Sequence, residues 1–244
     1  QRPVVSGINT PTEKLSWLLD TILHDLIQHV PAHLNSENEF IQILNKIDIS
    51  NPNSFCFSLD VVALYPSIPI PEAIEAIMNL VNEHKVIIEQ SGILISEIEY
   101  ILKLILENNI IRFGNKLYRQ KCGIAMGNRL APLIAIIFMH SLESKAKLNY
   151  SCFPDVYIRY IDDIFGIWNH SEDELNNFLN IMNNLHPNIK FTIEKPDSEG
   201  WLNFLRMSLK INNLQIDRKS YRKQSSKSIF LHANSHHSEL MKRN

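Results

Sequence analysis

The feature that most constrains the fold of this chain is a pair of adjacent aspartates, Asp162 and Asp163, between two short apolar runs. The runs, 156–161 and 164–168, are rich in the β-branched and aromatic residues that favour strands, so they predict a hairpin with both carboxylates at its tip. Adjacent like charges repel each other, and a divalent cation offsets this repulsion because hard carboxylate oxygens bind Mg²⁺. An ordinary solvated turn is the alternative, since aspartate also favours turns.

A third carboxylate, Asp60, stands near the end of another predicted strand, from Ser54 to Val61. Residues alternate along this segment with the period of a strand. One side carries Phe55, Phe57 and Leu59, and the other carries Ser54, Cys56, Ser58 and Asp60. If this strand neighbours the hairpin, the three carboxylates converge, and such a set can bridge two metal ions roughly 3.5–4 Å apart for phosphoryl transfer.

Helices and strands alternate along the rest of the chain. Helices are predicted after the capping segments Thr10–Glu13 (with Pro11 at the first helical position), Ser36–Glu39, Ser96–Glu99 and Ser171–Glu174, and over 72–84 and 130–148. A strand is predicted over 190–194, and hairpins over 110–120, turning at Gly114-Asn115, and over 201–217, turning at Asn212-Asn213. This order predicts an α+β domain with an antiparallel sheet covered by helices on one face.

Composition narrows the possible classes of protein. The net charge of −2 is close to zero, yet Lys and Arg dominate from Arg218 to the end, so this tail is either a phosphate-binding segment or a solvated terminus. The three cysteines are scattered without a Cys-x-x-Cys pair, so neither disulfides nor a structural zinc site is expected. No apolar run is long enough for a bilayer, so no membrane partner is expected. Because the chain begins at Gln1, we expect a fragment of a longer protein.

Three segments, in order, resemble the catalytic motifs of reverse transcriptases. They are Phe57–Pro69, Gly123–Pro132 and Tyr160–Asp163. Within that superfamily the chain is most similar to the reverse transcriptases of Penelope-like retroelements. This closer resemblance rests on the segments Arg2–Asn9, Pro11–Leu15, Ala125–Gly127, Tyr221–Lys223 and Ser235–His237.

The resemblance implies a right-hand polymerase, an α+β palm with partial fingers. Residues 1–50 would form part of the fingers, 51–217 the palm with interleaved fingers segments, and 218–244 a basic tail that starts a thumb or connection. The implied function is the RNA-directed DNA polymerase core of a retroelement. Its partners would be an RNA template, a DNA primer and dNTPs, its cofactor two Mg²⁺ ions for which Mn²⁺ can substitute, and its location the nucleus.

The same resemblance implies roles for residues around the carboxylates. Asp60, Asp162 and Asp163 would be the catalytic metal ligands, with the backbone of Val61 as a further ligand. Tyr65 matches the steric gate, an aromatic ring that fills the space of a ribose 2′-OH and so favours deoxynucleotides.

Other residues would contact the nucleotide. Gly123, Met126 and Gly127 would let backbone approach the incoming nucleotide and the template. Arg2 would bind the triphosphate, unless it is only a terminal residue. Lys190 resembles the lysine that protonates the leaving pyrophosphate, and Lys195 is close enough to compete for this role. For both lysines the alternative is a solvated side chain. Phe204 and Leu205 resemble the primer grip, and their alternative is a plain core hairpin.

Two positions depart from the family's pattern. Arg129 stands where Gly-Ser-Pro usually ends, and Arg206 follows Phe-Leu where an aspartate is usual. These changes leave open a degenerate or repurposed fragment that binds nucleic acid without catalysis. A palm enzyme that polymerises ribonucleotides is a third possibility, which Tyr65 opposes. The oligomeric state is left open.

Overall fold

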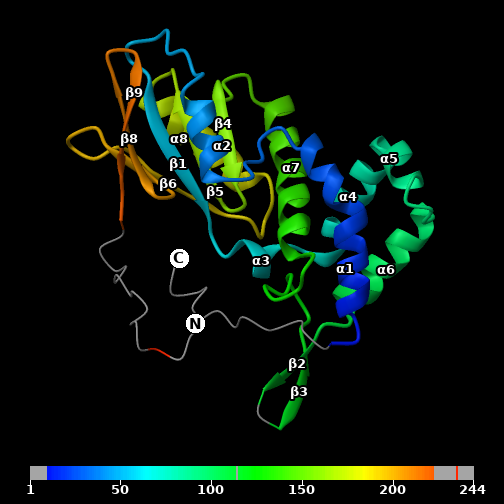
Figure 1. The fold of residues 1–244 in the computed structure, drawn as a ribbon. Coiled ribbons are helices and arrows are strands. Elements are labelled where there is room, and N and C mark those ends of the chain that lie inside the picture. Colours follow the sequence, from blue (N-terminus) through cyan, green and yellow to red (C-terminus); the bar gives the residue numbers. More distant parts are fainter. Residues whose placement is uncertain (1–9, 114, 223–234, 236–244) are drawn as a thin grey trace.

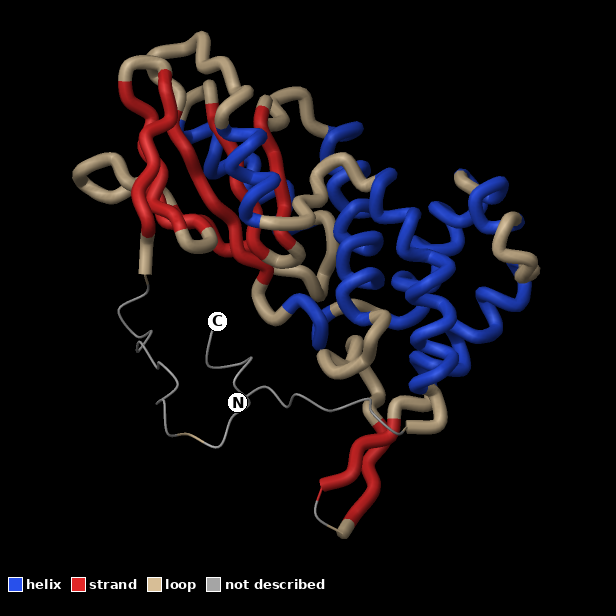
Figure 2. Tube along the Cα trace, viewed as in Figure 1, coloured by secondary structure: helices blue, strands red, loops and turns tan. Residues whose placement is uncertain are grey.

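The structure is a computed structural model that describes residues 10–113, 115–222 and 235. Strands gather in one half of the molecule and most helices in the other, and a two-stranded hairpin projects from the helical half (Figures 1 and 2). The expectations for Arg2, for the segment Arg2–Asn9, for Gly114 and for the tail from Lys223 onward, Ser235 apart, lie outside the described residues.

A four-stranded antiparallel sheet forms the centre of the strand-rich half. Its strands are β1 (Phe55–Val61), β4 (Val156–Tyr160), β5 (Asp163–Trp168) and β6 (Phe191–Glu194), in the order β4-β5-β1-β6. The central hairpin and the strand over 190–194 are thus confirmed. The strand that ends near Asp60 lies directly beside β5, as the convergence of the carboxylates requires.

Two smaller sheets complete the strands. They are β2 (Ile110–Phe113) with β3 (Lys116–Arg119), and β7 (Leu202–Phe204), β8 (Met207–Asn212) and β9 (Gln215–Ser220). Phe113 pairs with Lys116, so the two strands of the first hairpin are confirmed in the predicted register. The segment 201–217 differs from its prediction: it reverses direction at Leu205 as well as at Asn213, and the start of the basic tail belongs to β9.

The helices are listed here by their bounds: α1 (Glu13–Leu23), the short η1 (His24–His29), α2 (Glu37–Leu44), α3 (Leu64–Ser67), α4 (Ile70–Glu83), α5 (Lys85–Glu89), α6 (Ile95–Glu107), α7 (Ala131–Asn149) and α8 (Glu172–Asn184). Among the described residues, no helix is long and apolar enough to cross a membrane.

Two predicted caps are confirmed and two are wrong. Ser36 and Ser171 accept hydrogen bonds from the third residue of α2 and α8, as capping residues do. At α1, Thr12 rather than Thr10 precedes the helix, and it makes no side-chain cap, so Pro11 lies outside the helix. At α6 the helix begins one residue before Ser96, and the carboxylate of Glu97 accepts the backbone N–H of Leu94 instead.

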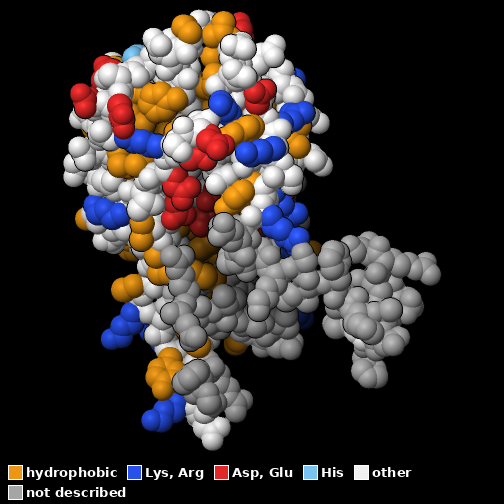
Figure 3. All heavy atoms as spheres, turned by 90° about the vertical axis from the view of Figure 1, so that its left-hand side faces the viewer, with side chains coloured by type: hydrophobic (Ala, Val, Ile, Leu, Met, Phe, Trp, Pro, Cys, Tyr) orange, Lys and Arg blue, Asp and Glu red, His pale blue; other side chains and the backbone are white. Residues whose placement is uncertain are grey.

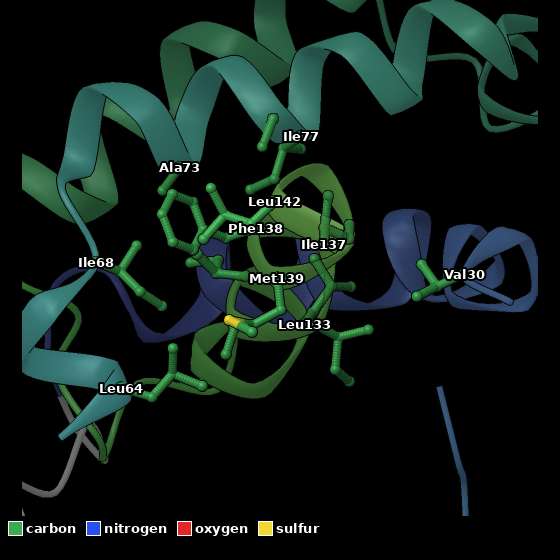
Figure 4. Packing of buried hydrophobic residues seen from close by; sticks show 14 of the residues in the cluster. Val30, Leu64, Ile68, Ala73, Ile77, Leu133, Ile137, Phe138, Met139 and Leu142 are labelled. Atoms are coloured by element: carbon green, nitrogen blue, oxygen red, sulfur yellow. The ribbon is translucent and has the colours of Figure 1, made fainter. Parts of the chain in front are cut away.

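The apolar helix α7 is the centre of the larger core. It packs against α4 and η1, and its side chains interlock with those of α3 and α4 (Figure 4). Phe138 and Leu142 of α7 lie with Ala73 and Ile77 of α4 in one buried cluster. Residues 133–139 of α7 are all buried, so this part of the helix is apolar on every side.

The second face of the central sheet is also covered, which corrects the prediction of helices on one face only. Phe40 of α2 contacts Phe165 of β5 and Phe204 of β7, with ring centroids 5.1 and 5.0 Å apart. Cys56 and Phe57, neighbours that point to opposite faces of β1, are therefore both buried. Helix α2 and the β7–β8 hairpin supply the cover that alternation in β1 alone does not reveal.

Candidate active site

The central hairpin presents its aspartates on a tight and strained turn. Tyr160 pairs with Asp163, which leaves Ile161 and Asp162 as the two turn residues. Ile161 has φ 56°, a left-handed conformation that a β-branched residue adopts only at a cost of about 1–3 kcal/mol. A turn of this kind persists only where its surroundings hold it, so its supports are part of the site.

The three aspartates meet at the end of two adjacent strands. Asp60 is the register partner of Asp163 across β1 and β5. The backbone N–H of Val61 donates to the carbonyl of Asp162 at 3.2 Å, which joins the turn to the end of β1. Asp60 is exposed and the other two are half-buried, so solutes can reach them. Acidic side chains gather near the middle of this sheet side of the molecule (Figure 3).

This donor set fits a hard divalent cation. Mg²⁺ prefers carboxylate oxygens, and it neutralises the charges that would otherwise repel one another at these strand ends. The backbone register brings Asp60, Asp162 and Asp163 to one strand end, and their role as its ligands stays a prediction. The backbone of Val61 lies beside them, and its role as a further ligand stays a prediction.

Tyr65 lies beside the aspartates. Its side chain is half-buried, and burial, then the negative charge of Asp162, raise the pKa of the Tyr65 phenol above its usual value. Helix α3 carries the residue just after β1, following Ala63 in a left-handed conformation with φ 50°. The phenol is thus within range of the charge of Asp162, and the role of Tyr65 as a steric gate stays a prediction.

The glycine loop is attached directly to Tyr65. The N–H of Ile124 donates to the Tyr65 carbonyl at 2.7 Å. Gly123 has φ +74°, and a Cβ atom there would lie 2.5 Å from the carbonyl oxygen of Pro66. The glycine is thus explained by close packing of two backbone segments, one from each motif.

A family model described as "Reverse transcriptase (RNA-dependent DNA polymerase)" matches residues 1–205 of the chain. The chain belongs to the reverse transcriptase family. Nucleotidyl transfer is therefore the chemistry of its enzyme class. A search of curated proteins gives no match.

Solved polymerases share the fold of this reverse transcriptase domain. Telomerase of Candida tropicalis, truncated from its C-terminal domain, has a TM-score of 0.60 at 17% identity, covering 86% of this chain and 45% of the other. Telomerase of Candida albicans with a TWJ fragment of telomeric RNA has a TM-score of 0.56 at 14% identity, covering 87% and 38%. The RNA-dependent RNA polymerase of bacteriophage phi12 has a TM-score of 0.52 at 14% identity, covering 85% and 33%.

These likenesses establish the α+β polymerase palm as the fold of the reverse transcriptase domain. The chain spans less than half the length of each of these solved relatives.

Among the remaining candidates in this reverse transcriptase domain, the two lysines are separated by the structure. The carbonyl of Lys190 accepts the N–H of Val62, just after the aspartate end of β1, and its ammonium donates to the Asn183 carbonyl at 2.6 Å. Lys195 lies beyond the opposite end of β6 and forms an ion pair with Glu172. The structure thus brings Lys190, and not Lys195, to the carboxylate end of the sheet.

The other candidates are placed less directly. Met126 and Gly127 are half-buried in the loop that Gly123 begins, and their nucleotide contacts stay predictions. Phe204 is buried against Phe40, so its position is explained by core packing. Leu205 occupies the following turn with φ 51°, and its primer contact stays a prediction.

Both departures from the family's pattern have partners in the fold. Arg129 donates to the carboxylate of Asp20 on α1 at 2.9 Å, tying the glycine loop to that helix. Arg206 lies 3.4 Å from a carboxylate oxygen of Glu37 and is largely exposed. Both arginines therefore pair with acidic residues other than Asp60, Asp162 and Asp163.

Sequence reasoning missed Arg159, whose side chain is fully buried behind the turn. The guanidinium bonds both carboxylate oxygens of Glu143 at 2.5 and 3.0 Å, and donates to the carbonyl of Ile161 at 3.2 Å. The sequence signal was a lone charge inside a strand of apolar and aromatic residues, one position before the turn motif.

A separate group of potential metal ligands is formed by Cys152, His170 and Glu174, whose ligand atoms lie within 4.8 Å of one another. It adjoins the Trp168 end of β5, whereas Asp163 begins that strand. This group is therefore apart from the candidate active site.

Proposed function

We propose that this chain is the catalytic core of an RNA-directed DNA polymerase, which adds dNTPs to the 3′-OH of a DNA primer along an RNA template. The observation that carries the proposal is the register of Asp60 with Asp163, with Asp162 bonded to Val61 beside them. The polymerase palm fold and the family match support it. Phosphoryl transfer depends mainly on positioning and charge neutralisation, which this arrangement suits.

Asp60, Asp162 and Asp163 would hold two Mg²⁺ ions, for which Mn²⁺ can substitute. When bound, such ions lower the pKa of an attacking hydroxyl and stabilise the leaving oxygen. The chain's own contribution is to fix the carboxylates by the β1–β5 pairing and the Val61 bond, so that little rearrangement is needed on binding.

Tyr65 would select deoxynucleotides. Its ring adjoins Asp162, and its main chain is bonded to Ile124, so the ring is attached to a fixed backbone. A 2′-hydroxyl directed at this ring would meet it sterically, which lowers the rate of ribonucleotide addition.

We further propose that the domain comes from a Penelope-like retroelement and acts in the nucleus. The support is the set of segments that resemble that group, from Pro11–Leu15 to Tyr221–Lys223. The division into partial fingers, palm and the start of a thumb or connection belongs to the same proposal. Sequencing the genomic flanks tests it, because a retroelement should encode further fingers and thumb segments on either side.

Primer extension on an RNA template with Mg²⁺ and dNTPs tests the polymerase proposal, using the chain both alone and with its natural flanks. Asp162→Asn should lower extension by about 10²–10³-fold, because the amide cannot replace the carboxylate charge. Asp173→Asn, the same change at an exposed position on α8, is the matched control and should extend normally. Equal extension by the wild type and Asp162→Asn would contradict the assignment.

A second candidate is a nucleic-acid-binding domain without catalysis. The observation that favours it is the pair of departures from the family's pattern, Arg129 and Arg206. This candidate predicts RNA binding that weakens steeply with salt, together with no extension even by the protein with its flanks restored.

A further inference from the structure

Arg159 is a charged residue at a place where a charge is costly. Its side chain is 0% exposed, on a strand whose neighbours are mostly apolar or aromatic. A buried ion pair seldom adds net stability, since desolvation offsets the attraction, and apolar residues of similar size often do as well. Stability alone therefore does not account for Arg159 and its partner Glu143.

The side chain of Arg159 connects three segments. The guanidinium donates two hydrogen bonds to the carboxylate of Glu143 on α7. It donates a third, at 3.1 Å, to the carbonyl of Ile136, also on α7. The remaining bond goes to the Ile161 carbonyl, in the turn itself. The guanidinium thus fastens the turn to the most deeply buried helix of the molecule.

The backbone of Arg159 is held as well. Its N–H donates to the carbonyl of Ala32 at 2.6 Å, and its carbonyl accepts the N–H of Leu34 at 2.8 Å. Strand β4 is the edge of the central sheet, so these bonds supply the outer partner that an edge strand lacks. The anchor of the turn is therefore rigid in both its main chain and its side chain.

The turn has two supports on its carbonyls. Arg159 bonds the carbonyl of Ile161, and Val61 bonds the carbonyl of Asp162. Without the first support, only the Val61 bond to the next residue would remain, and the left-handed Ile161 would relax toward an unstrained conformation. Relaxation would rotate the peptide that leads into Asp162 and move its carboxylate relative to Asp60.

We propose that Arg159, anchored by Glu143, is a positioning residue that holds the strained turn so that the aspartates bind divalent metal. The inference rests on the proposed function, since it concerns the same metal site. It assigns a role to a residue that touches neither the metal nor the substrate, and the effect of losing it should appear first in metal affinity.

The test replaces the whole buried network with apolar residues, so that no charge or hydroxyl is left unpaired. The variant combines Arg159→Met, Glu143→Leu and Tyr157→Phe, because the Tyr157 hydroxyl donates to Glu143 at 3.1 Å. Tyr157→Phe alone is the matched control, since it removes one bond to Glu143 and leaves the bond to Ile161. Mn²⁺ binding is measured by electron paramagnetic resonance, and folding by thermal unfolding.

The triple variant should fold and bind Mn²⁺ about tenfold to 100-fold more weakly, a loss typical of residues that orient metal ligands. The Mg²⁺ concentration for half-maximal extension should rise by the same factor, while Tyr157→Phe should match the wild type. A folded triple variant with unchanged Mn²⁺ affinity would overturn the inference.

Arg159→Lys keeps the positive charge and is the second variant, should the triple variant not fold. A lysine ammonium cannot bond Glu143, Ile136 and Ile161 together, so the same loss of Mn²⁺ affinity is expected. Unchanged affinity would overturn the inference. Asp162→Asn separates the two proposals: if the wild type binds Mn²⁺ no better than Asp162→Asn, the metal site itself is wrong.

Discussion

Asp60 lies opposite Asp163 in the antiparallel register of β1 and β5, so two acidic residues far apart in the chain share one strand end. Two carboxylates held this close repel each other in the absence of a cation. A bound cation would offset this repulsion, so the metal-bound protein should be more stable than the metal-free protein.

Asp163→Asn should therefore uncouple stability from metal. Unfolding of each protein without Mg²⁺ gives its own reference, so that the cost of the substitution itself is separated from the effect of the metal. With excess Mg²⁺ the wild type should gain stability in proportion to the logarithm of the concentration above its Kd, and the variant should gain much less. Thermal unfolding at increasing Mg²⁺ measures both effects; an equal gain in both proteins would contradict the metal assignment.

Tyr65→Ala should relax sugar selection. Removing the ring opens the space beside Asp162, so the ratio of dNTP to rNTP incorporation efficiency should fall by about tenfold or more. Tyr100→Ala, at a tyrosine that is 68% exposed on α6, is the control for loss of a tyrosine. Single-nucleotide incorporation with each substrate gives the ratio, and an unchanged ratio in Tyr65→Ala would exclude the steric gate.

Gly123→Ala should destabilise the fold by about 2–4 kcal/mol, because left-handed strain and overpacking against Pro66 add together. Gly92→Ala is a matched control, since Gly92 has a similar φ of +76° but no atom within 4 Å of the added Cβ. That control should lose only about 1 kcal/mol, from backbone strain alone. Urea unfolding measures both; equal losses would show that the contact with Pro66 is unimportant.

His33 should make stability depend on pH. Burial, and then the positive charge of Arg159, lower the pKa of His33 from 6.5 to about 4, and its buried Nδ1 atom has no hydrogen-bond partner among the described residues. The unfolded chain therefore binds more protons between those values, so stability should fall as pH drops from about 6.5 to 4.

The variant His33→Leu should flatten this pH dependence, which thermal unfolding between pH 4.5 and 7.5 would reveal. His170→Gln removes an exposed histidine and is the control for loss of a histidine as such. A slope in His33→Leu equal to that of the wild type would assign the pH dependence to other groups.

Local patterns predicted the parts of the fold that depend on local chemistry. The hairpin at Asp162-Asp163, the caps at Ser36 and Ser171, and the strand before Asp60 all follow from nearby residues. The convergence of the three aspartates was predicted only for the case that the two strands are neighbours. Local patterns do not determine this, because pairing of β1 with β5 is a tertiary contact.

The features of the fold that local patterns did not predict depend on contacts between residues far apart in the chain. In the sequence, Arg159 looks like an ordinary charged residue of a strand. Its burial depends on Glu143, which comes from another element. Cys56 occupies the expected polar side of β1, yet Phe40 and Phe204 cover that side. The nucleotide role of Gly123 stays a prediction, and its contact with Pro66, which the sequence did not predict, arises from packing of two motifs.

The most direct measurement of the central claim is addition of one dNTP to a primer on an RNA template by the wild type and by Asp60→Asn. Asp60 belongs to the first motif, so its loss tests whether the two strands build one metal site. We predict addition by the wild type and almost none by Asp60→Asn, with unchanged binding of primer and template. Addition by Asp60→Asn at the wild-type rate would contradict the account.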